Sequence, residues 1–249
     1  MAFNSTGNGP AARLIAKLDS IANLSAEEKA AVAALPFRER TVEEGVDLFR
    51  QGERPTESCV IVDGFACRYK VLGGGQRQIM SFHTPGDMPD LQSLHLKVMD
   101  HSLVSLTRCR VAMVPHQALL DLTNQWPGVT AALWRDTLID AAIFREWLAG
   151  VGRRTAHQRI AHLICEVYLR LKAVGMVDGA SFELPVTQAE VADALGLSPV
   201  HVNRVLQDLR RDGYIEWRGR QAVINDWQRL RSAADFDAGY LHLKPDLAA

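Results

Sequence analysis

The chain has 249 residues, a formal net charge of −1 and 47% hydrophobic residues. This composition predicts a globular protein of one to three domains with enough apolar residues for a core. The near-neutral charge excludes a histone-like protein that binds nucleic acid through bulk charge, although one basic face suffices for a site-specific binder. Apolar runs stay below the roughly 20 residues that a membrane helix needs, and the N-terminus lacks a signal region. We therefore expect a cytoplasmic protein with no membrane partner.

The four cysteines are scattered and form no C-x-x-C pair. They are Cys59, Cys67, Cys109 and Cys165. This spacing indicates buried, small apolar residues in a reducing compartment, without a zinc site or a disulfide framework. We predict neither a metal site nor a catalytic site.

The N-terminal part combines a polar tail with two short helices. Residues 1–10 are polar and glycine-rich, so we expect them to be disordered. A short helix follows over 11–21, and residues 1–24 form the predicted tail with its helix. Ser25 and Glu28 are spaced as a capping box for a second helix that ends before Pro36.

Short alternating segments separated by glycines characterise residues 37–115. Strands are predicted over 60–62, 65–71, 78–82 and 102–114, with no helix of useful length between them. This spacing favours a β-sandwich or roll. The predicted β domain covers residues 25–126.

A long helix is predicted over 127–152, and its last residues, from Gly150 to Gly152, are predicted to form a hinge. Apolar residues recur along it with the a/d spacing of a coiled-coil seam. The positions are Trp134, Thr137, Ala141, Phe144, Leu148 and Val151. At about 1.5 Å per residue the helix spans roughly 40 Å. We therefore predict a parallel homodimer along this seam.

Two short helices joined by a tight turn follow within a predicted domain of residues 153–232. Thr187 is spaced to cap the first helix, and Gly196 ends it. Ser198 caps the second helix, whose first residue is Pro199. This arrangement is a helix-turn-helix. The segments 214–218 and 221–224 then read as a β-hairpin, so the motif is winged. The remaining tail, 233–249, is mixed in composition, and its role is left unassigned.

The exposed face of the second helix and the wing carry groups that can bind DNA. Base edges in the major groove are read by hydrogen-bonding side chains near the start of such a helix. Residues 153–231 hold twelve basic and nine acidic residues, a small excess of positive charge. The predicted DNA-binding residues are Thr187, Gln188, Ser198, Pro199, Val200, His201, Asn203, Arg204, Gln207, Arg210, Arg211, Arg218 and Arg220.

The helix-turn-helix resembles that of the CRP/FNR superfamily of bacterial transcription regulators. The residues that match its pattern are Thr187, Val191, Ala192, Gly196, Leu197, Ser198, Val202, Arg204 and Leu206. The earlier β domain resembles the cyclic-nucleotide-binding-like roll of the same superfamily. Its matching segments are Gly45, 48–52, 60–64 and 85–87. The resemblance implies an α+β protein: an antiparallel, jelly-roll-like β-roll, a dimerisation helix and a winged helix-turn-helix.

The resemblance also bears on the effector. Members that bind cyclic AMP grip the ribose with a Gly-Glu pair and the phosphate with an arginine followed by a small hydroxyl residue. Here the corresponding places read Asp90-Leu91 and Met99-Asp100-His101, which offer no arginine to a buried phosphate. We expect no cyclic AMP binding of that kind. The cysteine cluster that holds an iron–sulfur cluster in oxygen-sensing members is also absent before Cys59.

No cofactor is predicted, and the effector stays unassigned. The candidate effector-pocket residues are His83, Asp90, Met99, His101, Phe144 and Arg145. Haem, which some members bind, remains an alternative, with His83 and His101 as the ligands to test.

The function implied by the resemblance is transcription regulation by a homodimer on double-stranded, pseudo-palindromic DNA, with RNA polymerase as a further partner to consider. Arg204 matches the arginine that reads guanine, whereas Val200 stands where many members have glutamate. Two other classes stay open. One is an adaptor whose winged helix binds a protein, and the other is a cupin-like metal protein, which needs clustered ligands around an open metal position. We do not predict an enzyme.

Overall fold

The computed structural model describes residues 9–248. The disorder expected for the tail therefore falls largely on residues outside the described part. The described chain forms two compact units. The first contains residues up to 70 together with 82–140, and the second contains 71–81 together with residues from 141 onward. No helix within 9–248 is both long and apolar enough to cross a membrane.

Two antiparallel sheets form the β-roll. The first has the order β1-β7-β3 and the second the order β2-β6-β4-β5. Their bounds are β1 Arg38–Val42, β2 Asp47–Phe49, β3 Glu57–Asp63, β4 Ala66–Val71, β5 Arg77–His83, β6 Ser102–Ser105 and β7 Cys109–Pro115. Apolar side chains such as Ile61, Leu103 and Val111 fill the space between the sheets. The cysteines Cys59 and Cys109 belong to this core, and all four cysteines of the chain are free and buried, as predicted.

The predicted strand over 102–114 is wrong in extent, because the chain breaks into β6 and β7 at residues 106–108. Gly64 lies beside the break. Its φ of +85° favours glycine, and a Cβ there would lie 2.7 Å from Thr107 Oγ1. Next to it, the Phe65 N–H donates to Thr107 Oγ1 at 3.0 Å. The close approach of the two segments thus requires glycine at position 64.

Within residues 37–115, two strands and one short helix were not predicted from the sequence. Four of the five residues of β1 are exposed, so its sequence lacks the alternation that marks a half-buried strand. Strand β2 has three residues, and the helix α3, Ser93–Leu96, has four. Elements this short leave no periodic pattern to detect.

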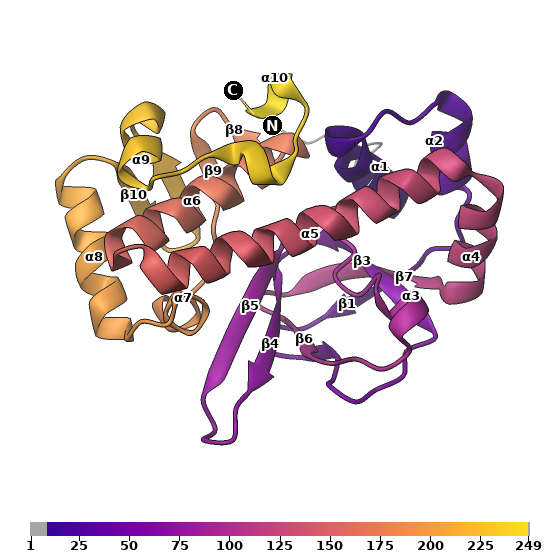
Figure 1. The fold of residues 1–249 in the computed structure, drawn as a ribbon, viewed down its shortest axis with the longest axis horizontal. Helices are drawn as coiled ribbons and strands as arrows, with labels where there is room; N and C mark the ends of the chain where they lie inside the picture. Colours follow the sequence, from indigo (N-terminus) through magenta and orange to yellow (C-terminus); the bar gives the residue numbers. More distant parts are fainter. Residues whose placement is uncertain (1–8, 249) are drawn as a thin grey trace. The chain divides into compact units, whose positions relative to one another are not determined.

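Helices cover the outer face of the β1-β7-β3 sheet (Figure 1). They are α1 Pro10–Ile21, α2 Ala26–Ala33, α4 His116–Gln125 and the first part of α5 Pro127–Arg153. Val60 of β3 and Val114 of β7 pack against Leu18 and Leu119 of these helices. The predicted capping box of α2 is confirmed: the Glu28 N–H donates to Ser25 Oγ, and the Ser25 N–H to Glu28 Oε2.

The long helix α5 is confirmed, and it contains the two glycines of the predicted hinge. Gly150 and Gly152 both lie inside α5, which continues to Arg153. The chain reverses at the next two residues, and α6, Ala156–Ala173, begins with a capping box between Thr155 and Gln158. The cap ends one helix and starts the next, because Thr155 holds an extended backbone conformation (φ −65°, ψ 161°).

The second unit contains the winged helix-turn-helix and the end of the chain (Figure 1). Its helices after α6 are α7 Gln188–Leu195, α8 Pro199–Arg211, α9 Trp227–Ala233, the 3-10 helix η1 Ala238–Leu241, and α10 Pro245–Ala248. Its strands are β8 Val177–Asp178, β9 Ser181–Glu183, β10 Ile215–Arg218 and β11 Gln221–Ile224, in the order β10-β11-β9-β8. The predicted hairpin and its two-residue turn at 219–220 are confirmed.

The C-terminal segment, for which no role was predicted, packs on α6. Phe236 and Leu241 are buried, and the rings of Phe236 and Tyr240 both contact His162. The Tyr240 hydroxyl donates to Glu166 Oε2 at 2.8 Å. The segment is therefore part of the core of the second unit.

Candidate nucleic-acid interface

Helix α7 and the turn after it are fixed by local hydrogen bonds. Thr187 Oγ1 accepts from the Glu190 N–H at 3.2 Å, and Glu190 Oε2 accepts from the Thr187 N–H at 2.7 Å. Gly196 ends the helix in the left-handed conformation (φ 63°), which costs a glycine little. The Leu197 N–H then donates to Ala192 O at 3.1 Å. These contacts set the tight turn before α8.

Helix α8 begins at Pro199, and Ser198 Oγ accepts from the His201 N–H at 3.2 Å. Its buried residues are Val202, Val205, Leu206 and Leu209, as predicted. These side chains hold one face of α8 against the core of the unit. The opposite face is left to solvent.

The solvent face of α8 presents one apolar and one cationic side chain near its first turns. Val200 is 81% exposed. Arg204 lies one turn later, is exposed, and makes no hydrogen bond or ion pair with any residue in the described part of the chain. His201 and Asn203 are half-buried beside them. A free guanidinium on such a face can form two hydrogen bonds with guanine.

The basic residues at the edges of this face differ in their surroundings. Arg210 and Arg220 are exposed, and the structure records no acidic partner for either of them within residues 9–248. Arg211, in contrast, bonds Asp208 Oδ1 at 2.7 Å and Asp212 Oδ1 at 3.0 Å. Arg218 lies 3.7 Å from Glu216. Of these four predicted DNA-binding residues, Arg210 and Arg220 could therefore contact phosphate without first breaking an ion pair with a carboxylate.

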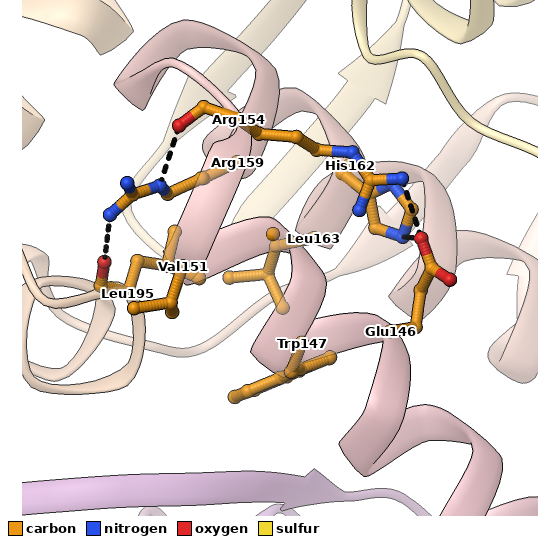
Figure 2. A pocket seen from close by; sticks show the side chains of 9 residues that line it. Glu146, Trp147, Val151, Arg154, Arg159, His162, Leu163 and Leu195 are labelled. Atoms are coloured by element: carbon orange, nitrogen blue, oxygen red, sulfur yellow. Dashed lines mark hydrogen bonds and ion pairs between the residues drawn. The ribbon is translucent and has the colours of Figure 1, made fainter.

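Arg159 of α6, which sequence reasoning missed, joins the end of α7 to the turn between α5 and α6 (Figure 2). Its Nε donates to Arg154 O at 2.9 Å and its Nη1 to Leu195 O at 3.0 Å. One guanidinium therefore donates hydrogen bonds to two carbonyls, one just after the end of α5 and one at the end of α7. Carbonyls at a helix C-terminus have no hydrogen-bond partner within the helix. The sequence position of Arg159, inside an amphipathic helix, gives no local signal for these two contacts.

The pocket around Arg159 is also lined by a partly buried ion pair (Figure 2). Arg154 Nη2 donates to Glu146 Oε1 at 2.5 Å, and His162 Nε2 lies 3.9 Å from the same oxygen. Burial and the nearby Arg154 lower the pKa of His162 to about 3, so this imidazole is neutral at pH 7. With a volume of about 20 Å³, the pocket has room for a water molecule and no larger ligand.

The predicted dimer residues divide into two groups along α5. Trp134 is 67% and Leu148 74% exposed, and Thr137 and Val151 are exposed as well. Ala141 and Phe144 are half-buried. Leu138, which was not predicted, is 57% exposed four residues after Trp134. Large apolar side chains thus remain uncovered on α5 within this chain.

The six predicted effector residues are divided between the two units. Phe144 and Arg145 belong to the second unit, and the other four to the first. Met99 is 2% exposed within the core between the sheets, and Asp90 is completely buried. His101 Nδ1 lies 2.7 Å from Asp100 Oδ1, and His83 Nδ1 lies 3.6 Å from Asp87 Oδ2.

A buried arginine inside the roll was missed. Arg68 of β4 is 4% exposed, and its Nε donates to Pro89 O at 2.7 Å. Its Nη1 pairs with Asp140 of α5. This guanidinium is therefore bonded to both a carbonyl and a carboxylate.

Burial perturbs the acid–base groups near Arg68. It raises the pKa of Asp90 to about 7, although Asp90 Oδ1 accepts from the Cys59 N–H at 2.9 Å. Burial, followed by the charge of Arg68, lowers the pKa of His83 to about 4. Among the described residues, no group of three or more His, Cys, Asp and Glu side chains is placed to hold a metal ion.

Comparison with known proteins agrees with both halves of the fold. Residues 39–125 match the cyclic nucleotide-binding domain, and residues 158–233 match the Crp-like helix-turn-helix domain. The chain belongs to the CRP/FNR superfamily of transcription regulators. These matches confirm three predictions from the sequence: the family, the α+β fold class, and a regulator in place of an enzyme.

Relatives resemble the chain over most of its length. It is 28% identical to the transcriptional activator protein FnrL of Cereibacter sphaeroides, over 87% of this chain and 88% of FnrL. It is 25% identical to the transcriptional activator protein FnrA of Stutzerimonas stutzeri, over 82% and 83%. The structure of FixK2 from Bradyrhizobium japonicum aligns with a TM-score of 0.72 at 24% identity, covering 82% of this chain and 100% of FixK2. The chain is a DNA-binding transcription regulator of the CRP/FNR type.

Proposed function

We propose that this regulator binds a pseudo-palindromic operator as a homodimer and reads each half-site with α8. The observation that carries the proposal is the solvent face of α8, where Val200 and the unpaired Arg204 stand one helical turn apart. A two-fold dimer presents two such helices to successive major grooves, about 10 base pairs apart. Arg204 would donate hydrogen bonds to guanine, and Val200 would contact a thymine methyl group.

The proposed dimer contact is the exposed apolar side of α5. Trp134, Leu138 and Leu148 expose more than half of their surface, and exposed apolar side chains gathered along one element mark protein contacts. Leu138 follows Trp134 by four residues, and Leu148 follows Leu138 by ten, which is one heptad plus three; both steps fit the a/d positions of a coiled-coil seam. A second copy of α5 is the partner that this spacing fits.

Replacing Leu148 with glutamate is therefore expected to separate the dimer and to lower operator affinity by at least about tenfold. The charge would face its copy across the seam, where like charges and lost apolar contact both disfavour pairing. Sedimentation would measure the oligomeric state. The control is Ala149→Glu, at an exposed position about 100° further round the helix. Equal effects of the two variants would contradict the proposed seam.

Replacing Arg204 with alanine is expected to remove about 1–3 kcal/mol of discrimination at one base pair of each half-site. Competition binding with each base substituted in turn measures this loss. Arg210→Ala is the matched control, because Arg210 lies near the end of α8 and is expected to weaken binding to all sequences alike. A uniform loss for Arg204→Ala would show instead that it contacts phosphate.

We further propose that the roll does not respond to cyclic AMP in the manner of members that bind it. Asp90 and Asp100 replace the expected ligand groups, and Arg68 is bonded within the roll. An effector of another kind, haem included, or none at all, fits the same observations. Equilibrium dialysis with cyclic AMP tests the proposal, and saturable binding would overturn it.

The relatives' names suggest the remaining partners. FnrL and FnrA are called transcriptional activator proteins, and an activator works through RNA polymerase. We propose RNA polymerase as a partner of this chain and the cytoplasm, where bacterial DNA lies, as its location.

Selection of genomic fragments by the purified protein tests the whole proposal. We expect enrichment of a two-fold symmetric site, with an affinity that falls steeply as salt rises because bound phosphates release counterions. Binding of a protein partner together with no salt-dependent DNA affinity would favour an adaptor instead. Repeating the selection with haem or with cell extract distinguishes a missing effector from a wrong assignment of the winged helix.

A further inference from the structure

Asn203 stands on the solvent face of α8 with half of its hydrogen-bonding capacity already in use. A carboxamide has two N–H donors and an oxygen with two acceptor positions. Asn203 Nδ2 donates to Gln188 Oε1 at 3.1 Å, and Asn203 Oδ1 accepts from Gln207 Nε2 at 2.9 Å. One donor and one acceptor of Asn203 remain for a ligand.

The three amides come from both helices of the motif. Gln188 is the first residue of α7, whereas Asn203 and Gln207 lie one turn apart on α8. A side chain held on both sides loses less freedom when it binds than a free one, so its orientation is set before DNA arrives. We refer to Gln188, Asn203 and Gln207 as the amide relay.

The remaining donor and acceptor match one base. In the major groove adenine presents the N6 amino donor beside the N7 acceptor, which a carboxamide can bind with two hydrogen bonds. Guanine presents two acceptors, thymine an acceptor beside a methyl group, and cytosine a donor without an adjacent acceptor. Of the four bases, adenine alone satisfies both free groups of Asn203.

We propose that Asn203 determines specificity for adenine at one position of each half-site, and that Gln188 and Gln207 act as positioning residues for it. The inference rests on the proposed DNA-binding role of α8 and adds the base that it selects. Arg204, the next residue along α8, has an exposed guanidinium, so the adenine is expected close to the guanine that Arg204 reads.

The test is selection from a randomised DNA library, followed by binding to sites with each base at each position. Wild-type protein is expected to prefer adenine at one position of the half-site by about 5- to 150-fold, the range of a good two-bond contact. Asn203→Ala should abolish the preference at that position and leave the others. Gln188→Ala should reduce the preference at the same position by several-fold.

Two further variants separate positioning from simple contact with DNA. Gln188→Glu keeps an acceptor for Asn203 Nδ2, so it should restore the adenine preference while lowering affinity for all sequences through repulsion of phosphate. Gln228→Ala, an exposed amide on α9, should leave the base profile unchanged.

The outcomes distinguish this inference from the proposed function. A selected symmetric site whose base profile is unaltered by Asn203→Ala would overturn the inference and leave the regulator intact. Loss of affinity on all sequences with Gln188→Ala, at unchanged adenine preference, would show that Gln188 is a phosphate contact. Failure to select any site, both without additions and with haem or cell extract added, would overturn the proposed function and this inference with it.

Discussion

Replacing Glu166 with alanine is expected to lower the free energy of unfolding by about 3–5 kcal/mol, the cost of removing one partner from a buried ion pair. Glu166 has no exposed surface, and its Oε1 accepts from Arg170 Nη1 at 3.3 Å. Its Oε2 accepts from Trp147 Nε1 at 3.0 Å and from the Tyr240 hydroxyl at 2.8 Å. One carboxylate thus joins α5, α6 and the C-terminal segment.

Urea unfolding of the full chain measures this effect. Glu166→Gln keeps a carbonyl oxygen for Trp147 and Tyr240 but loses the charge that faces Arg170, so it should fall between wild type and Glu166→Ala. Glu183→Ala, at an exposed position of β9, is the control and should change stability by less than about 0.5 kcal/mol. If Glu166→Ala unfolds like this control, the buried network contributes no stability.

Replacing Asp90 with asparagine is expected to flatten the pH dependence of stability. The pKa of Asp90 rises from 3.8 to about 7 on folding, mainly because burial disfavours the charged carboxylate. Between these values the folded state holds a proton that the unfolded state has released. Unfolding free energy therefore falls as pH rises through this window and levels off above it. Over the whole window, the unfolding free energy falls by about 4 kcal/mol.

The measurement is urea unfolding of both proteins at pH 5 and pH 8. From pH 5 to pH 8, the unfolding free energy of wild type should fall by about 3 kcal/mol more than that of Asp90→Asn. The difference is below the complete value of about 4 kcal/mol because the unfolded-state carboxyl is already largely ionised at pH 5. The amide oxygen can still accept from the Cys59 N–H. Comparing the two proteins cancels other titrating groups, including His83, whose pKa is lowered to about 4 and which acts in the opposite direction. Asp178→Asn, at an exposed position, should follow wild type, and a parallel pH response of all three proteins would contradict the prediction.

The amino-acid sequence by itself determined the helix-turn-helix almost to the residue. Thr187, Gly196, Ser198 and Pro199 act through contacts with residues three or four positions away, so their effects can be read from spacing alone. The buried face of α8 follows from helical periodicity in the same way. Likewise, the length of α5 and the hairpin of the wing are local properties of the chain.

Only the tertiary structure decided how the buried charges are paired. Arg68 meets Asp140 across 72 positions, and Tyr240 meets Glu166 across 74. No spacing rule connects residues so far apart, because their proximity depends on how whole elements pack. The same holds for Arg159, whose two carbonyl partners lie at the ends of different helices. The amide relay also belongs here, since Gln188 and Asn203 come together only when α7 and α8 pack against each other. Local interactions thus fixed the elements of this regulator, whereas long-range packing fixed its polar networks.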